Sequence, residues 1–177
     1  MNQAEQLALP VKLLLLDVDG VLTDGRITYD SQGQEQKCFH IHDGLGIKLL
    51  QSHGIRVGIV TGRCSPMVER RANELGIDLV LQGREDKWAA ASSILEQLGL
   101  TASQLAYMGD DLPDLAAIHH AGLGIAPANA ASAVRQHANL ITQQRGGQGA
   151  VREACEFILA AQGHWDGVLS GYLGSHP

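Results

Sequence analysis

Two aspartates follow the most apolar run of the chain. The run is Leu13–Leu16, and Asp17 and Asp19 come directly after it. An uninterrupted apolar run bounded by turn residues is typical of a strand that is buried on both faces. Side chains two residues apart along a strand point the same way, so both carboxylates would lie at the carboxyl end of this strand. Adjacent carboxylates raise each other's pKa, so the pair predicts a positive group beside it.

Two later apolar segments also end in polar residues. Arg56–Thr61 continues into Gly62-Arg63, and Leu105–Met108 is followed by Gly109-Asp110-Asp111. Lys87 opens a predicted helix after a short strand. Ligands of open α/β sheets bind beyond the carboxyl ends of the strands, so we expect these groups to converge on one crevice. The residues expected there are Asp17, Asp19, Thr61, Gly62, Arg63, Lys87 and Asp110.

The expected cation is a hard divalent ion. Carboxylates from two strand ends supply oxygen atoms, with no His or Cys beside them. Mg²⁺ binds through few carboxylates and keeps positions open for water and phosphate oxygens. The sequence therefore predicts Mg²⁺, which offsets the charge of Asp17, Asp19 and Asp110.

The elements that position these groups alternate between strand and helix along the chain. Short connections between them favour a doubly wound α/β fold, in which helices cover both faces of a Rossmann-like parallel sheet. The length of 177 residues suits one domain, residues 1–177. No stretch is long enough for a separate cap domain.

The predicted insertion is a β-hairpin after the first strand, within residues 26–42. Arg26–Tyr29 and Glu35–Ile41 alternate loosely around a four-residue turn. It is either a flap over the ligand site or a pairing surface for another subunit. An isolated hairpin is marginal in water, so we favour an oligomer contact.

Other local signals predict helix ends and chain ends. Asp43 is expected to cap the helix that ends near Gly54, Ser65 the helix beginning at Pro66, and Asp86 the helix beginning at Lys87. Residues 1–10 are expected to form a frayed arm. The Gly-rich tail, residues 163–177, is expected to be flexible.

Composition limits the classes of protein and partner. A net charge of −6 and a pI of about 5.7 argue against a nucleic-acid binder that relies on general basicity, but allow an anionic small-molecule substrate. No apolar run approaches the ~20 residues that cross a bilayer, so we expect no membrane association. The three cysteines lack metal-ligand spacing, which is typical of reduced thiols in a cytoplasmic protein.

The motifs D-x-D-G-V-x-T, T-G-R, a lysine and G-D-D-x-x-D occur in this order. The chain thereby resembles the haloacid dehalogenase-like phosphohydrolases over residues 13–114, and the matching residues are Asp17, Asp19, Thr61, Lys87, Asp110 and Asp114. The resemblance implies that Asp17 is a nucleophile forming an aspartyl-phosphate and that Asp19 is the general acid/base. It implies a metal held by Asp17, the backbone carbonyl of Asp19, and Asp110. Asp114 either orients its loop or caps a helix, and Asp111 is either an outer metal ligand or a cap.

A closer similarity covers residues 11–163. Asp24-Gly25, the segment Phe39–Gly46, the Arg63–Arg71 spacing and the run Arg145–Glu153 are similar to the family of 3-deoxy-D-manno-octulosonate (KDO) 8-phosphate phosphatases. This family acts on a sugar-acid phosphate in lipopolysaccharide biosynthesis. The resemblance implies a capless homotetramer in which hairpins pack together centrally and neighbouring subunits help to close each site. His42 departs from the family pattern, which often has Arg there.

The resemblance also implies residues that bind the substrate. These are Thr61, Gly62, Arg63, Arg71 and Lys87. A guanidinium can grip a carboxylate or a phosphate with two hydrogen bonds. Helical spacing would place Arg71 about two turns beyond Arg63, so one of the two arginines is expected to serve a neighbour's site. Arg145 and the glycines after it are either a mobile gate or an ordinary loop. His40 and His42 would share a strand face, but the oxygen ligands already account for a hard cation.

Three functional hypotheses remain open. The first is a phosphatase for the eight-carbon KDO 8-phosphate. The second is a phosphatase for a nine-carbon, sialic-type sugar 9-phosphate, from which pocket shape would distinguish it. The third is a non-catalytic module that tetramerises a partner. That reading predicts a lost nucleophile or lysine, whereas Asp17 and Lys87 are both present.

Overall fold

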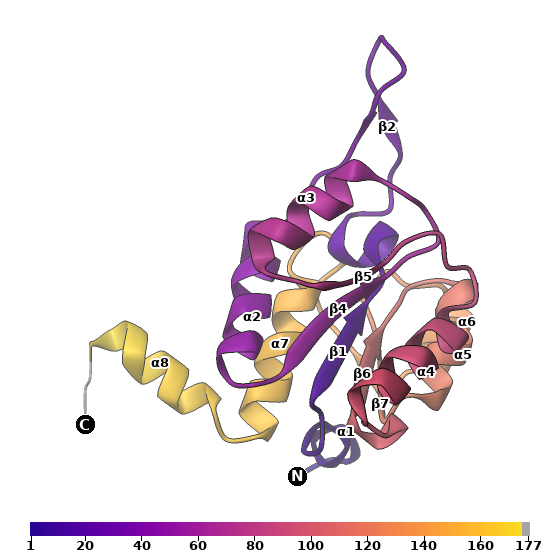
Figure 1. The fold of residues 1–177 in the computed structure, drawn as a ribbon. Coiled ribbons are helices and arrows are strands. Elements are labelled where there is room, and N and C mark those ends of the chain that lie inside the picture. Colours follow the sequence, from indigo (N-terminus) through magenta and orange to yellow (C-terminus); the bar gives the residue numbers. More distant parts are fainter. Residues whose placement is uncertain (175–177) are drawn as a thin grey trace.

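The computed structural model describes residues 1–174, which fold around a six-stranded parallel sheet (Figure 1). The strand order is β5-β4-β1-β6-β7-β8. The strands are β1 (Leu13–Leu16), β4 (Arg56–Val60), β5 (Leu79–Leu81), β6 (Leu105–Met108), β7 (Leu123–Ala126) and β8 (Leu140–Ile141). Without the hairpin strands this is the Rossmann order, whose crevice lies where the order reverses, beside the first strand. The switch point therefore falls between β1 and β6, which pair in register from Leu13 with Leu105.

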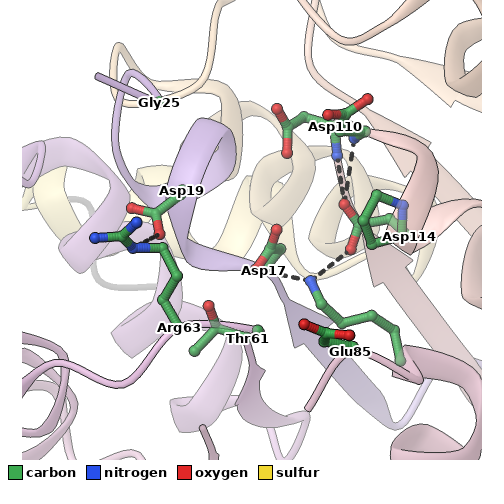
Figure 2. A pocket seen from close by; sticks show the side chains of 12 residues that line it. Asp17, Asp19, Gly25, Thr61, Arg63, Glu85, Asp110 and Asp114 are labelled. Carbon is green, nitrogen blue, oxygen red and sulfur yellow. Dashed lines mark hydrogen bonds and ion pairs between the residues drawn. The ribbon is translucent and has the colours of Figure 1, made fainter. Parts of the chain in front are cut away.

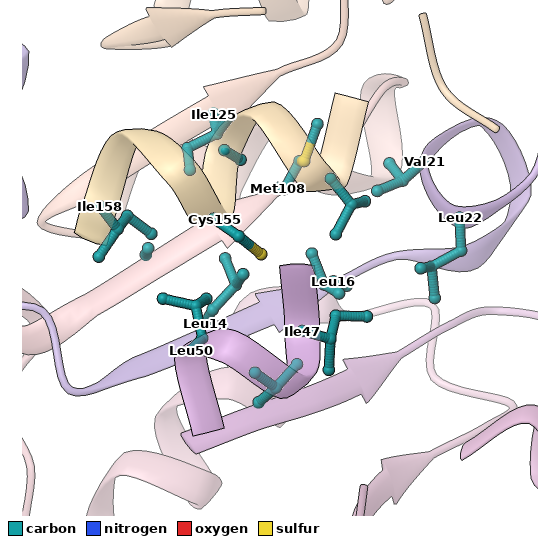
Figure 3. Close-up of a cluster of buried hydrophobic side chains, with 14 of the residues drawn as sticks. Leu14, Leu16, Val21, Leu22, Ile47, Leu50, Met108, Ile125, Cys155 and Ile158 are labelled. Carbon is teal, nitrogen blue, oxygen red and sulfur yellow. The ribbon is translucent and has the colours of Figure 1, made fainter. Parts of the chain in front are cut away.

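Helices cover both faces of the sheet, as the alternation of elements predicts. One face carries α1 (Gln3–Ala8), α2 (Ile41–Ser52), α3 (Pro66–Leu75) and α7 (Ala150–Ala161), and the other carries α4 (Lys87–Leu98), α5 (Leu115–His120) and α6 (Ser132–His137). Strand β1 contributes to both cores, because Leu14 and Leu16 pack under α2 and α7 (Figure 3) whereas Leu13 and Leu15 face α4 and α5. The predicted doubly wound fold is confirmed.

The turn after β1 brings the aspartate pair close to β6. Residues Val18–Leu22 form a distorted helical turn in which Gly20 has φ +91°. A Cβ atom on Gly20 would lie 2.0 Å from Oδ2 of Asp110. Glycine is required here, since any side chain would displace Asp110 and would also be strained at this φ.

The inserted hairpin is present and shorter than predicted. Its strands are β2 (Thr28–Tyr29) and β3 (Glu35–Gln36), which pair antiparallel. Figure 1 shows the hairpin projecting from the body of the molecule. The return strand does not extend to Ile41, because helix α2 begins there. Elsewhere in the described residues, the sheet strands are connected by helices and loops without a cap domain.

The predicted helix caps are correct at two positions and wrong at a third. Ser65 caps α3 and Asp86 caps α4 through their side-chain oxygens. Helix α2 is capped by His40, whose ring accepts a hydrogen bond from the backbone N–H of His42. The side chain of Asp43, in the first turn of α2, is instead buried against the start of α7. There its Oδ1 accepts a hydrogen bond from the backbone N–H of Arg152 at 2.8 Å.

Both chain ends contain a helix that the sequence analysis does not predict. Residues 3–8 form α1, which Asn2 and Glu5 stabilise through a capping box, so a frayed arm is the wrong description. The tail contains α8 (Trp165–Leu173), in which Val168 is buried. It is therefore helical over most of the segment expected to be flexible. Residues 175–177 lie outside the described part. Across residues 1–174, the helices are too short or too polar to cross a bilayer.

Candidate active site

A cavity of about 780 Å³ opens at the carboxyl ends of β1, β4 and β6 (Figure 2). Its lining residues are Asp17, Asp19, Gly25, Thr61, Gly62, Arg63, Glu85, Lys87, Asp110, Asp111, Pro113 and Asp114. The structure thus brings together seven of the eight predicted site residues. The exception is Arg71, which does not line this cavity.

Lys87 lies between two carboxylates at the inner end of the cavity. Its Nζ is 2.9 Å from Oδ1 of Asp17 and 2.9 Å from Oδ1 of Asp114, and only 3% of the side chain is exposed. Burial lowers the pKa of Lys87, but the two carboxylates raise it more, so the net shift is upward. Lys87 is therefore protonated, and its ammonium group is held in one position by the two carboxylates. It is held at the first position of α4, which Asp86 caps.

Asp114 organises the inner end. Its Oδ1 accepts from Lys87 and, at 2.8 Å, from the hydroxyl of Tyr107, while its Oδ2 accepts from the backbone N–H groups of Asp110 and Asp111. The last two bonds hold the loop after β6, so the loop-orienting alternative is correct for Asp114. Asp111 caps the short helix that follows. Tyr107 is a contributor that no sequence motif indicates, since it reads as an ordinary core residue of β6.

Asp17 and Asp110 are the carboxylates that suit a cation. Oxygen atoms of Asp17, Asp110 and Asp114 lie within 4.8 Å of one another. Burial, followed by the charge of Asp114, raises the pKa of Asp17 to about 6 and that of Asp110 to about 7. The oxygens of Asp114 already accept four hydrogen bonds. Asp17 and Asp110 are therefore the carboxylates with oxygen atoms left to bind a metal ion. These oxygen ligands and the excess negative charge fit Mg²⁺. A contribution from the carbonyl of Asp19 stays a prediction.

Asp19 and Arg63 line the outer part of the cavity, and two hairpin residues that do not line it, Glu35 and Lys37, contact them. These four charged residues are called the rim. Oδ2 of Asp19 is 3.7 Å from Nε of Arg63, and Lys37 forms an ion pair with Oδ1 of Asp19. Glu35 contacts both cations at 3.1 Å. Sequence motifs missed Glu35 and Lys37. The available signal was their spacing of two in the predicted return strand, which would place opposite charges on one face.

Thr61 directly follows β4 and is 2% exposed. Its backbone N–H donates to the carbonyl of Leu81, which anchors β4 against β5, and its side chain lines the cavity beside Gly62. Figure 2 shows Thr61 near Asp17, and Nζ of Lys87 lies 2.9 Å from Oδ1 of Asp17. A hydroxyl and an ammonium group therefore lie near the predicted nucleophile, where they can bind the oxygen atoms of a phosphate.

Arg71 lies on α3, outside this cavity. Its guanidinium is 3.3 Å from Glu74 and 5.9 Å from the ring centroid of Phe39. The helical spacing predicted between Arg63 and Arg71 is wrong, because Arg63 precedes α3. Binding of substrate by Arg71 in a neighbouring subunit stays a prediction.

The glycine loop after Arg145 is docked against the turn that carries the aspartates. The backbone N–H of Gly147 donates to the carbonyl of Val21 at 2.9 Å, and a Cβ atom on Gly146 would lie 1.7 Å from the carbonyl oxygen of Gly20. Close backbone contact explains these glycines, which favours a fixed loop over a mobile gate. Arg145 itself is exposed.

His40 and His42 lie at the start of α2, where their rings pack edge-to-face with the ring centroids 4.9 Å apart. Within residues 1–174, the group of His, Cys, Asp and Glu side chains close enough to hold a metal is the acidic one at the inner end of the cavity.

The fold and this cavity define a haloacid dehalogenase-like hydrolase. The family model with that description matches residues 80–153, which carry Lys87, Asp110 and Asp114. The matched residues do not include the first motif or Thr61, Gly62 and Arg63.

Comparison with individual proteins narrows the class. The chain is 44% identical over 153 residues to 3-deoxy-D-manno-octulosonate 8-phosphate phosphatase of Haemophilus influenzae, covering 86% of this chain and 85% of that protein. The Escherichia coli K12 enzyme of the same name is 43% identical over 156 residues, which are 88% of this chain and 83% of that enzyme. The chain belongs to the family of 3-deoxy-D-manno-octulosonate 8-phosphate phosphatases.

Solved structures agree with this assignment. The crystal structure of the phosphatase of this name from Moraxella catarrhalis, in complex with magnesium, phosphate and KDO, superposes with a TM-score of 0.95 at 47% identity, covering 97% of this chain and 99% of that one. The cobalt-bound Haemophilus influenzae structure gives 0.89 at 40% identity, with coverage of 97% and 99%.

Proposed function

We propose that this protein is a magnesium-dependent phosphatase that hydrolyses KDO 8-phosphate to KDO and phosphate. The observation that carries the proposal is the buried contact of Asp17 with Lys87, beside Asp110, at the switch point of the sheet. Membership of the family supports the substrate. The resemblance implies that the reaction belongs to lipopolysaccharide biosynthesis.

In the first step, Asp17 attacks the phosphorus atom and the bond to the sugar oxygen breaks. A carboxylate nucleophile divides the hydrolysis into two displacements. Asp19 donates a proton to the departing sugar oxygen, so that KDO leaves as an alcohol. The phosphoryl group is then held on Asp17 as an aspartyl-phosphate.

In the second step, water attacks the phosphorus atom of the aspartyl-phosphate. Asp19 accepts the proton of this water, and the bond to Asp17 breaks to release phosphate. Asp19 thereby recovers the proton that it gave up in the first step. Both steps develop charge on the phosphate oxygens, which Thr61, Gly62 and Lys87 bind through a hydroxyl, a backbone N–H and an ammonium group.

Asp17, Asp110 and the carbonyl of Asp19 would hold the magnesium ion. When bound, the ion neutralises charge on the carboxylates and the phosphate. Its presence would also relieve the unfavourable burial that raises the pKa values of Asp17 and Asp110.

A homotetramer in the cytoplasm is part of the same proposal. The hairpin and the start of α2 expose Tyr29 by 60% and Ile41 by 78%, and such side chains favour contact with another subunit. A neighbour would then bring Arg71 to the substrate. Free cysteines suit a reducing compartment. Light scattering at micromolar concentration tests the assembly, and a monomer would contradict it.

The function is tested by phosphate release from a panel of substrates, with Mg²⁺ and with EDTA. The panel contains KDO 8-phosphate, a nine-carbon sialic-type sugar 9-phosphate and glucose 6-phosphate. We expect the highest kcat/KM for KDO 8-phosphate and no turnover in EDTA. Equal kcat/KM for the eight-carbon substrate and glucose 6-phosphate would overturn the substrate assignment.

A further inference from the structure

Lys37 has an almost completely buried side chain, although it lies on a mostly exposed hairpin. Only 2% of its side chain is exposed, and its Nζ contacts Oδ1 of Asp19 and, at 3.1 Å, Oε1 of Glu35. A buried ammonium group is costly unless it is paired. These two carboxylates provide the pairing, so the position of Lys37 is tied to the position of Asp19.

Arg63 completes a ring of four charged groups. It contacts Oδ2 of Asp19 at 3.7 Å and Oε2 of Glu35 at 3.1 Å, and its side chain is 44% exposed. The two cations that hold Asp19 therefore differ. Lys37 is enclosed on the hairpin side, whereas Arg63 lies at the open side of the cavity, where a substrate can draw it away.

We propose that Lys37 is a positioning residue for Asp19, and that the hairpin is thereby part of the catalytic geometry. The inference rests on the proposed role of Asp19 in proton transfer. A carboxylate that must face the leaving oxygen and then a water molecule needs a fixed rotamer. Lys37 holds Oδ1, which leaves Oδ2, on the side of Arg63, as the oxygen that exchanges the proton.

The test compares Lys37→Met with Lys37→Arg, using Lys48→Met as the control because Lys48 is an exposed lysine outside the cavity. Each variant is assayed with KDO 8-phosphate, with glucose 6-phosphate and with para-nitrophenyl phosphate. The first two have poor alkoxide leaving groups that need a proton. The nitrophenolate ion leaves without one, so its release depends little on a general acid. The thermal midpoint of each variant reports folding.

We expect Lys37→Met to lower kcat/KM by about 10²-fold with both sugar phosphates and by less than about 3-fold with the aryl phosphate. Lys37→Arg keeps the charge and should recover most of the loss, and Lys48→Met should match the wild type. A loss with KDO 8-phosphate alone would make Lys37 a substrate-binding group. An equal loss with all three would make it merely structural, and either result overturns the proposal.

Failure of the proposed substrate gives a different signature. In that case the wild type would not prefer KDO 8-phosphate over glucose 6-phosphate. The contrast between alkyl and aryl leaving groups would still decide the role of Lys37.

Discussion

The inner end of the cavity and its rim both combine carboxylates with cationic side chains, but in different proportions. At the inner end, the carboxylates of Asp17, Asp110 and Asp114 share one ammonium group, that of Lys87. On the rim, two carboxylates meet two cations. When all three carboxylates are ionised, the inner end thus carries two uncompensated negative charges, which a divalent cation would neutralise, whereas the rim is neutral without one.

Burial differs between the two regions in the same sense. The side chains of Asp17, Lys87 and Asp114 are 11%, 3% and 1% exposed. On the rim, those of Asp19, Glu35 and Arg63 are 24%, 19% and 44% exposed, and Lys37 is the exception at 2%. Electrostatic interactions are stronger where water is excluded. The difference fits the proposed roles, in which the inner end binds and attacks the phosphate and Asp19 on the rim transfers protons.

The largest expected effect is at the inner end. Asp17→Asn removes the nucleophile, so we expect kcat to fall by at least about 10⁴-fold with the fold unchanged. Asp24→Asn, an exposed carboxylate in the same loop, is the matched control. Phosphate release and circular dichroism provide the measurements. Appreciable turnover by Asp17→Asn would remove the covalent mechanism.

Asp114→Ala tests whether the inner end depends on its hydrogen bonds. The substitution leaves Lys87 and Tyr107 without a shared acceptor, so the free energy of unfolding should fall by about 3 kcal/mol. Asp111→Ala, at an exposed cap, should cost only about 1 kcal/mol. Urea denaturation measures both. Equal losses would mean that Asp114 has no special structural role.

The stability of the metal-free protein should fall as the pH rises from about 4 to 7. Burial raises the pKa of Asp17 to about 6 and of Asp110 to about 7 from the ordinary value of 3.8. The folded state therefore keeps protons that the unfolded state has released. The resulting loss in the free energy of unfolding grows through this window to the order of a few kcal/mol. Urea denaturation in EDTA measures the fall, and Mg²⁺ should reduce it. Stability in EDTA that rises across this window, with no gain from Mg²⁺, would contradict this.

The smallest effect is expected on the rim. Glu35→Gln removes a carboxylate that contacts Arg63 and Lys37, of which Arg63 is partly exposed. We expect a loss of less than about 1 kcal/mol in the free energy of unfolding, because Lys37 keeps its contact with Asp19 and the ion pair with the partly exposed Arg63 contributes little. Thermal denaturation measures it. A loss as large as that of Asp114→Ala would erase the distinction between the two regions.

Local signals made the inner end predictable. An apolar run, a following Asp and a helix cap each specify where a side chain lies, so Asp17, Lys87 and Asp110 converge as expected. The rim was only partly predictable, because Lys37 reaches Asp19 through a hairpin whose direction no local pattern specifies.

The chain ends illustrate a different gap. Asn2 and Glu5 have the spacing of a capping box, which is a local signal for a helix start. The expectation that chain ends fray gave the wrong prediction there. In α8, Gly167 and Gly171 weaken the intrinsic preference for helix. Its packing through Val168 depends on tertiary contacts that the sequence pattern does not reveal.

The most direct test of the central claim is to trap the intermediate. Wild-type enzyme with Mg²⁺ and KDO 8-phosphate is quenched in acid during turnover, and its peptides are analysed by mass spectrometry. We predict one phosphoryl group, on Asp17, which is absent when EDTA replaces Mg²⁺. A phosphoryl group on another residue, or rapid turnover with no phosphorylated peptide at any quench time, would contradict the mechanism proposed for this cavity.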